Sequence, residues 1–278
     1  MYRAMRIALG LAVVVALTGC AGSVGPTQTE TINVPKPADL TQPWEVQLDL
    51  GVASVEVDSH GESLVQGVIE YNVPELKPIV TAEDLRVHIR QEFNGVLPIN
   101  SRNDWRLQLG RGVPLHLIVN TGASSGEWEL GGLSLRQLNW TQGAAGATLK
   151  FSEPNPERLE HFTINGGAAS LTARGLANAN IEVANFTAGA GAVTLYFDGQ
   201  LSQPAEVILD GGVSSIAIYS GGNPIQLITE GALKAVENTG WTQADNTYTS
   251  PEWGNASGPT ITIRARIGVA ALKLIAGM

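Results

Sequence analysis

The sequence has a single cysteine among its 278 residues, and only 15% of the residues are charged. One cysteine excludes both a disulfide framework within the chain and a zinc site built from cysteines. The net charge is −9, which argues against nucleic acid as the main partner, because phosphate binding requires clustered Lys and Arg. Low charge together with 44% hydrophobic residues is nevertheless typical of a folded chain with a full core.

The first apolar run, Ile7–Leu17, has eleven residues, too few to span a bilayer core of roughly 30 Å. It follows the basic residues Arg3 and Arg6 and ends in Leu-Thr-Gly-Cys20, an arrangement typical of a signal peptide. This segment resembles the lipobox of bacterial lipoproteins, whose cysteine is acylated and becomes the mature N-terminus. We therefore expect a lipoprotein signal peptide over residues 1–19 and lipidation of Cys20. The alternative is an ordinary signal peptide with an incidental cysteine.

Residues 20–44 are rich in Thr, Pro, Gly and Ser. This composition predicts a flexible, extended tether between the acylated cysteine and the folded domain, which we place at residues 45–278. Lipid attachment would anchor the protein at the extracytoplasmic side of a bacterial cell envelope, with the membrane as its first partner.

Glycine is abundant and recurs at corners followed by small residues. The first glycines of five corners are nearly evenly spaced along the chain: Gly122, Gly143, Gly166, Gly189 and Gly211. Their period of about 22 residues is typical of a repeat architecture. Two further corners, at Gly51 and Gly268, stand much farther from these in the sequence. Such distances leave room for intervening coils with longer loops.

Apolar residues return with a period of two after the corners, as in Val193, Leu195 and Phe197. This alternation indicates short strands with one buried face. A coil of about 22 residues cannot bury its apolar row alone, but stacked coils can. The sequence therefore predicts an all-β β-solenoid of rack-like stacked strands, with a β-sandwich as the alternative. Residues 227–236 are compatible with a short helix or a loop.

Several segments, in this order and spacing, resemble the toast-rack family of bacterial envelope proteins. They are Tyr71–Pro78, Val87–Gln91, Pro114–Ala123, Leu130–Leu135, Gly175–Asn180, Phe186–Gly191 and Thr194–Gly199. The resemblance implies an all-β rack with structural glycine corners and an uncharacterised function. The resemblance implies no catalytic residues. Related domains occur in regulators of cell-wall stress responses, and similar folds are called adhesin-like.

Motifs for catalysis or metal binding are not found in the sequence. The four histidines, His60, His88, His116 and His161, have neither helical nor His-x-His ligand spacing. Asp198 and Asp210, each followed by glycine, are twelve residues apart. That is about half a coil, so we expect them on different faces, as turn residues. We expect no metal and no cofactor.

Three aromatic residues cluster in a polar loop between Gly240 and Gly254: Trp241, Tyr248 and Trp253. Exposed aromatic side chains would contact an envelope glycan or a protein partner. The alternative is that the loop folds back and its aromatic side chains cover the open end of the core, as solenoid caps do.

These features favour a membrane-anchored surface lipoprotein with a non-enzymatic β-solenoid that serves as an envelope scaffold or ligand-binding module. One alternative is an accessory sensor of cell-wall stress, which rests on the family resemblance. Another is a polysaccharide-acting solenoid enzyme, which rests on architecture alone, and architecture does not fix function. The oligomeric state does not follow from the sequence.

Overall fold

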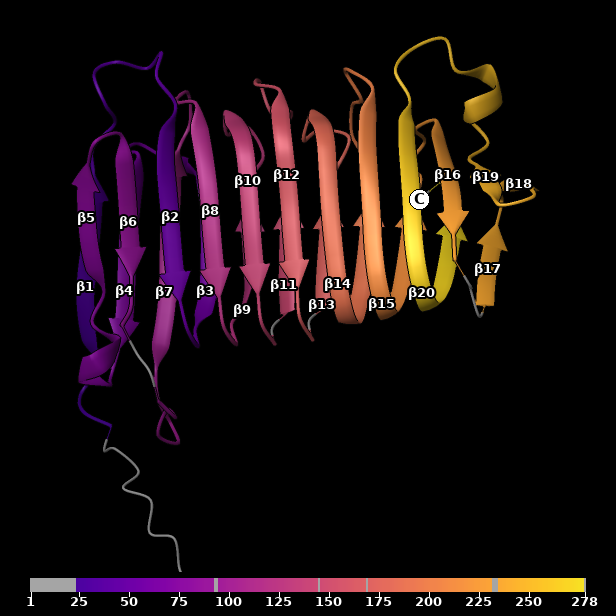
Figure 1. Ribbon diagram of the computed structural model, residues 1–278. Coiled ribbons are helices and arrows are strands. Elements are labelled where there is room, and N and C mark those ends of the chain that lie inside the picture. Colours follow the sequence, from indigo (N-terminus) through magenta and orange to yellow (C-terminus); the bar gives the residue numbers. More distant parts are fainter. Residues whose placement is uncertain (1–23, 93–94, 145, 169, 232–234, 278) are drawn as a thin grey trace, which may run out of the picture.

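The computed structural model describes residues 24–277 except 93–94, 145, 169 and 232–234. The chain forms a long two-layered rack of short strands (Figure 1). The described residues hold only two short 3₁₀ helices, η1 (Pro74–Leu76) and η2 (Trp253–Asn255), and neither is long or apolar enough to cross a membrane. The predicted all-β architecture is confirmed.

The strands of the first layer pair side by side in the order β5 (Ile79–Glu83), β6 (Arg86–Arg90), β2 (Trp44–Leu50), β8 (Leu115–Thr121), β10 (Leu135–Gln142), β12 (Leu159–Gly166), the first halves of β14 (Ile181–Tyr196), β15 (Ala205–Tyr219) and β20 (Ile261–Ile275), then β16 (Ile225–Glu230), β19 (Thr247–Thr249) and β18 (Thr242–Ala244). The second layer runs β1 (Gln28–Val34), β4 (Val65–Tyr71), β7 (Asn103–Gly110), β3 (Ser54–Gly61), β9 (Ser125–Glu129), β11 (Gly146–Lys150), β13 (Ser170–Arg174), the second halves of β14, β15 and β20, and β17 (Ala235–Thr239).

Each central coil contributes one strand to each layer, and equivalent strands pair in parallel. The inward residues Leu117, Leu138, Phe162, Ala184 and Val207 lie side by side across five strands. Because these partners follow one another in the sequence at nearly even intervals, the predicted solenoid with about 22 residues per coil is confirmed. A β-sandwich would join neighbouring strands by antiparallel hairpins, whereas among the described residues antiparallel pairing is confined to the strands near the two ends.

The glycine corners stack into one column along the lower edge of the rack. The backbone amide of Gly122 donates to the carbonyl of Gly51 at 3.0 Å, and that of Ala144 donates to Gly122 at the same distance. A Cβ at Gly122 would lie 2.8 Å from the oxygen of Gly51, and one at Gly143 would lie 2.8 Å from the oxygen of Gly122. Such separations are closer than real Cβ contacts, so these two corner positions require glycine.

The corners at Gly51 and Gly268 correct the expectation of intervening coils. Gly51 stacks directly on Gly122, and β20 pairs directly with β15. Of the strands between Gly51 and Gly122, β4 to β7 lie outside the β2–β3 coil, and β16 and β17 lie outside β20. Because the first and last coils are inserted between others, their apolar rows are buried on both sides.

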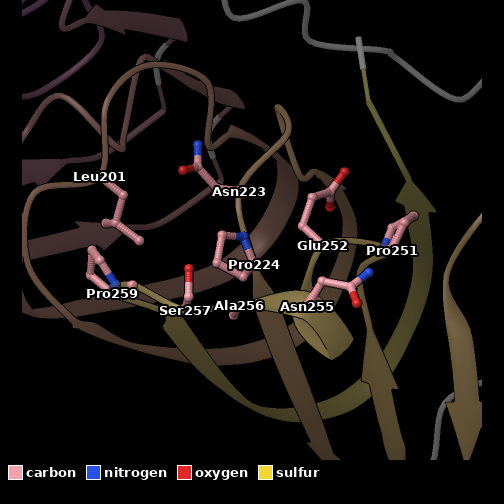
Figure 2. A pocket seen from close by; sticks show the side chains of 10 residues that line it. Leu201, Asn223, Pro224, Pro251, Glu252, Asn255, Ala256, Ser257 and Pro259 are labelled. Carbon is pink, nitrogen blue, oxygen red and sulfur yellow. The ribbon is translucent and has the colours of Figure 1, made fainter.

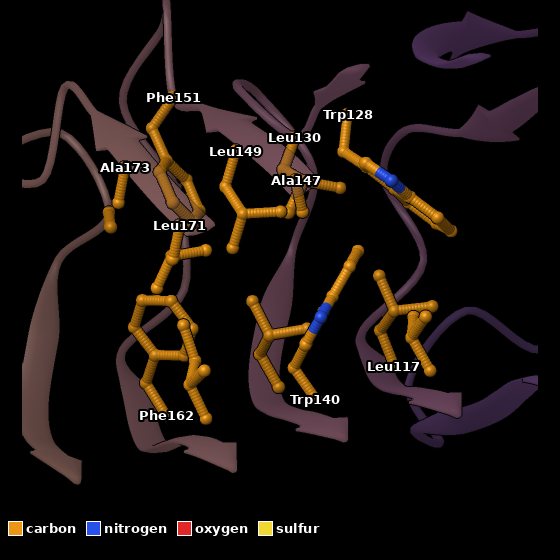
Figure 3. Packing of buried hydrophobic residues seen from close by; sticks show 14 of the residues in the cluster. Leu117, Trp128, Leu130, Trp140, Ala147, Leu149, Phe151, Phe162, Leu171 and Ala173 are labelled. Atoms are coloured by element: carbon orange, nitrogen blue, oxygen red, sulfur yellow. The ribbon is translucent and has the colours of Figure 1, made fainter. Parts of the chain in front are cut away.

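Inward-facing side chains of the two layers form one continuous hydrophobic core. Aromatic rings meet edge to face within it. The centroids of Trp128 and Trp140 are 4.6 Å apart (Figure 3), and those of Phe162 and Phe186 are 5.0 Å apart. The indole of Trp140 also donates to Gln142 Oε1 at 3.0 Å. The large rings thus fill the space between the layers, and the polar atom of Trp140 is satisfied.

Two sequence-based predictions are wrong within the described residues. The tether predicted over residues 20–44 contains β1, which pairs antiparallel with β4 along its whole length. Strand β1 forms because Ile32, which is 4% exposed, joins the core. The Thr- and Pro-rich composition of the segment does not indicate this burial. Within residues 227–236, where a short helix or a loop was expected, Leu227–Glu230 belong to β16 and Ala235 and Val236 belong to β17, while residues 232–234 lie outside the described residues.

Replacing Gly175 should destabilise the rack more than replacing Gly112. Both glycines have positive φ, +70° and +78°, but a Cβ at Gly175 would lie 2.2 Å from the oxygen of Phe151, whereas nothing lies within 4 Å of one at Gly112. We expect Gly112→Ala to lower the free energy of unfolding by about 1 kcal/mol and Gly175→Ala to lower it by roughly 2–4 kcal/mol, because the clash adds to the backbone strain. Urea unfolding measures the free energy of unfolding of both variants. An equal decrease in the two variants would contradict the predicted clash between a Cβ at residue 175 and the Phe151 oxygen.

Candidate functional site

The aromatic loop folds back onto the end of the core. Trp241 is 6% exposed and Tyr248 is 4% exposed, and both belong to the hydrophobic core. Tyr248 lies on β19, opposite the inward residue Leu227. Their prediction as ligand contacts is therefore wrong and the capping alternative fits, because the end coil would otherwise leave its apolar row open to water. Trp253 lies half-buried in η2. Cys20 lies outside the described residues.

The histidines lie apart on the outer faces, and two of them bond to nearby carboxylates. His88 Nε2 lies 2.6 Å from Asp49 Oδ2 and so joins β6 to β2. His60 Nδ1 lies 2.5 Å from Asp58 Oδ1. Burial, followed by the positive charge of Arg136, lowers the pKa of His116. Among the described residues, no three His, Cys, Asp or Glu side chains gather closely enough to hold a metal ion.

Asp198 and Asp210, and the further acidic residue Glu127, have structural partners. Asp198 Oδ1 accepts the backbone N–H of Gly175 at 3.0 Å, which ties two coils at a turn. Asp210 pairs with Arg266 across strands at 2.9 Å, and Glu127 pairs with Lys150 at 2.6 Å. These carboxylates do not converge on a cleft. The last two form cross-strand pairs of the kind that stabilise neighbouring strands.

A ladder of three side chains on the outer face of the second layer is the strongest candidate site. Arg174, Tyr196 and Tyr219 are the last residues of β13, β14 and β15. The guanidinium carbon of Arg174 lies 4.0 Å from the centroid of the Tyr196 ring. The two tyrosine rings stack with centroids 4.2 Å apart and planes 14° from parallel. We call these three residues the Arg–Tyr ladder.

The parallel register explains why these side chains meet. Tyr196 and Tyr219 are register partners, and Ala173 pairs with Leu195, which places Arg174 beside Tyr196. All three face outward because they alternate with inward neighbours. They also lie at the ends of strands that run away from the glycine corners, so the ladder occupies the edge of the rack opposite the corner column.

Arg174 is exposed and has no carboxylate within 4.0 Å among the described residues. Of the other cations in the described part of the chain, only Lys36 shares this property. The guanidinium lies instead over the face of the Tyr196 ring, which orients it without pairing it with a carboxylate. Arg174 therefore keeps its capacity to bind an anion.

Burial raises the pKa of the Tyr219 phenol, and the neighbouring Tyr196 raises that pKa further. The ladder thus presents a guanidinium and two phenol groups side by side, and both kinds of group can donate hydrogen bonds. Such an array can bind a carboxylate and an adjacent hydroxyl group, but it contains neither a nucleophile paired with a base nor a pair of carboxylates.

Sequence reasoning missed the ladder although a signal was present. Arg174, Tyr196 and Tyr219 are separated by one coil period each, so they occupy equivalent positions in successive coils. Comparing outward positions across the repeats would have found them. The aromatic residues predicted as contacts, Trp241, Tyr248 and Trp253, are close together in the sequence, whereas the ladder residues are close together only in the fold.

A pocket of about 550 Å³ lies at the upper edge, between the turn before β16 and the segment before β20 (Figure 2). One carboxylate oxygen of Glu252, Oε2, is buried and has no hydrogen-bond partner among the described residues. The pocket is lined by Leu201, Asn223, Pro224, Pro251, Glu252, Asn255, Ala256, Ser257, Gly258 and Pro259. It is shallow and mostly neutral, and its lining lacks a second charged group to orient a ligand.

A family model matches a little over half of the chain. The N-terminal domain of toast_rack, DUF2154, matches residues 23–174. No protein with a curated description matches the sequence. Among solved structures, a "putative cell adhesion protein" from Clostridium sporogenes shares 19% identity with a TM-score of 0.46, and the alignment covers 89% of this chain and 99% of that one.

Two further structures align over similar lengths. A "putative adhesin" from Bacteroides fragilis shares 10% identity with a TM-score of 0.42, covering 90% of this chain and 97% of that one. A "putative lipid binding protein" from Parabacteroides distasonis shares 8% identity with a TM-score of 0.39, covering 90% and 96%. Likenesses at this level do not indicate a shared ligand.

The Asp49 cluster yields a stability prediction with a defined pH dependence. Burial tends to raise the pKa of Asp49, but hydrogen bonds from Gln47, Asn120 and His88 outweigh it and lower the pKa. A lowered folded-state pKa contributes stability above the unfolded pKa, about 3.9, and this contribution is lost as the pH falls through the folded-state pKa. We expect Asp49→Asn to lower the free energy of unfolding at pH 7 by about 0.5–1.5 kcal/mol, since the group is partly exposed.

The difference between wild type and Asp49→Asn should narrow as the pH falls from 5 towards 2, which urea unfolding at several pH values measures. Asp84→Asn is the matched control, because Asp84 is exposed in the turn between β5 and β6 and should leave stability unchanged at every pH. A difference between wild type and Asp49→Asn that does not change with pH would contradict the role of the Asp49 charge.

Proposed function

Because the chain belongs to the toast-rack family, whose N-terminal domain matches residues 23–174, we propose that it is a lipid-anchored, non-enzymatic binding module of the bacterial cell envelope. Its ligand is a polysaccharide that carries carboxylate groups, and its contact surface is the Arg–Tyr ladder. The observation that carries this proposal is the exposed Arg174 guanidinium, stacked on Tyr196 and left without a carboxylate partner in the described part of the chain.

The anchor follows from the first twenty residues. The basic residues, the eleven-residue apolar run and Leu-Thr-Gly-Cys20 support cleavage before Cys20 and acylation of its thiol. Cleavage would remove Arg3 and Arg6 and leave 15 basic and 26 acidic residues, a net charge of −11. No basic cluster then lies near Cys20 in the sequence to bind anionic lipid, so membrane attachment would depend on the acyl chains.

The ladder favours a sugar polymer with sparse carboxylates over other anions. Nucleic acid carries a phosphate on every residue and would be repelled by the acidic chain, which offers a single unpaired cation here. A carboxylate can accept two hydrogen bonds from the planar guanidinium. The neighbouring phenols can hydrogen-bond sugar hydroxyl groups. A rigid parallel sheet holds these donors at fixed spacing, so binding costs little free energy for ordering of the protein.

A binding role fits the ladder better than glycoside cleavage does. Hydrolysis of a glycosidic bond requires two carboxyl groups that face one another across the sugar, and the ladder contains none. The outward carboxylates Glu127 and Asp210 are engaged by Lys150 and Arg266. The rack would therefore hold a glycan without cutting it.

Substituting the ladder should weaken binding to acidic polysaccharides. We expect Arg174→Ala to lower the affinity about ten-fold or more, because a charged hydrogen-bond pair is lost. Arg174→Lys should recover only part of the affinity, because the planar stacked fork is lost. Tyr219→Phe should lower it by roughly two- to five-fold, through loss of one hydroxyl group. A glycan array followed by calorimetry with uronate-containing oligosaccharides measures these effects.

Arg136→Ala is the matched control, because Arg136 lies on the outer face of the first layer and pairs with Glu160 at 2.7 Å. It should leave the affinity unchanged. Binding that is equal in wild type and Arg174→Ala, or binding of neutral glycans alone, would refute the assignment of the ligand. Turnover of the bound glycan would refute the non-enzymatic role.

The anchor is tested separately by Cys20→Ser. Expressed in a bacterium with its signal peptide, the wild type should incorporate labelled palmitate and sediment with membranes. Cys20→Ser should lose both properties while the domain remains folded by circular dichroism. Equal label in the two proteins, or no label in the wild type, would contradict lipidation at Cys20.

A further inference from the structure

The loop between β6 and β7 carries the most exposed apolar side chains in the described part of the protein. Val96 is 93% exposed and Ile99 is 87% exposed, whereas the other exposed large hydrophobic residues are only 36–47% exposed. Leu97, between them, packs against the core instead. The loop is therefore held by Leu97 while Val96 and Ile99 point into solvent, an unfavourable arrangement unless something covers them.

The same loop is joined to the start of the described chain. The backbone N–H of Gly25 donates to the carbonyl of Asn72 at 2.7 Å. The side-chain amide of Asn72 donates to the carbonyl of Asn100 at 3.0 Å, and its Oδ1 accepts the N–H of Arg102 at 2.6 Å. One residue thus holds the N-terminal segment and the end of the loop together. Figure 1 shows both at the lower edge of the rack, where the loop projects beyond the strands.

This connection places the loop near the proposed lipid. Gly25 is five residues after Cys20, and five extended residues span at most about 18 Å. An acylated Cys20 lies at the membrane surface, so the lower edge of the rack cannot move far from it. An interfacial segment needs to enter only about 5–10 Å to bury apolar side chains.

The charge pattern of the loop suits lipid. No charged residue occurs from 93 to 101. The flanking charges are already paired, since Glu92 accepts from Arg90 at 3.0 Å and Arg102 pairs with Asp104 at 2.8 Å. The loop can therefore enter an apolar phase without stripping water from an unpaired charge.

We propose that the segment Gly95–Asn100 inserts Val96 and Ile99 into the interface of the bilayer that holds the lipid anchor. This inference rests on the proposed lipidation of Cys20. The two contacts together fix the rack with its corner edge facing the membrane. The Arg–Tyr ladder, at the opposite ends of its strands, then points away from the bilayer towards an external ligand, as does the pocket before β20.

The test uses full-length lipidated protein with an environment-sensitive fluorophore on a single introduced cysteine, since acylation blocks Cys20. Val96→Cys is the reporter. Leu85→Cys is the control, because Leu85 is 42% exposed in the turn between β5 and β6, at the upper edge of the same end of the rack (Figure 1). Both proteins are reconstituted into vesicles of phosphatidylethanolamine and phosphatidylglycerol, and quenching by aqueous iodide is measured.

We expect the Val96 label to be quenched at least about three-fold less in vesicles than in detergent solution, as depth in the interface requires. The Leu85 label should be quenched equally in both. Equal quenching of the Val96 label in vesicles and detergent would overturn the proposal. So would protection in detergent at rising protein concentration, which would show that a second copy covers the loop.

The failure of the anchor remains distinguishable from the failure of the loop. Reaction of the fluorophore with Cys20 in the wild-type protein, with loss of that protein from the vesicle fraction, would refute lipidation and with it the basis of this inference. Protein that stays with the vesicles while its Val96 label remains fully accessible would refute insertion of the loop alone. Circular dichroism of each variant confirms that the exposed positions tolerate cysteine.

Discussion

The close stacking of backbone at the glycine corners is the constraint on which the rest of this rack depends. At Gly122 and Gly143 the carbonyl oxygen of the neighbouring coil lies 2.8 Å from where a Cβ would be, so glycine is needed where these equivalent corners stack. Once the corners coincide, the central strands β12, β14, β15 and β20 are in register with one another, because a slip by one residue would turn the apolar row outward. The edge-to-face contact of Trp128 with Trp140 and the Arg–Tyr ladder both follow from that register.

The two ends of the rack are closed by additional strands. The β2–β3 coil and β20 are placed between other coils instead of at the ends. The outermost described strands are antiparallel to their neighbours except β17, which pairs in parallel with β20. At one end Trp241 and Tyr248 then cover the last apolar row. Solenoids need such caps because an uncovered coil exposes both apolar side chains and unpaired strand edges.

The two outer faces and two edges of the rack therefore have different properties. Cross-strand pairs such as Lys150 with Glu127 engage most outward cations, which makes the unpaired guanidinium of Arg174 distinctive. The corner edge carries the chain start and an apolar loop, while the opposite edge carries the ladder and the shallow pocket. A structural repeat has thus placed the proposed membrane-facing edge and the proposed ligand-facing edge at opposite ends of the same strands.

The sequence alone determined the solenoid, because glycine spacing and apolar alternation are local patterns that return once in every coil. It also indicated the proposed signal and lipid site, which depend on consecutive residues. Three features were decided by tertiary structure. The Thr- and Pro-rich segment became β1 because β4 offered it a pairing edge. The corners at Gly51 and Gly268 joined the central column because distant coils were inserted. Trp241 and Tyr248 are buried because they cover apolar side chains of the last coil. A pattern of neighbouring residues in the sequence does not show that these side chains need to be covered.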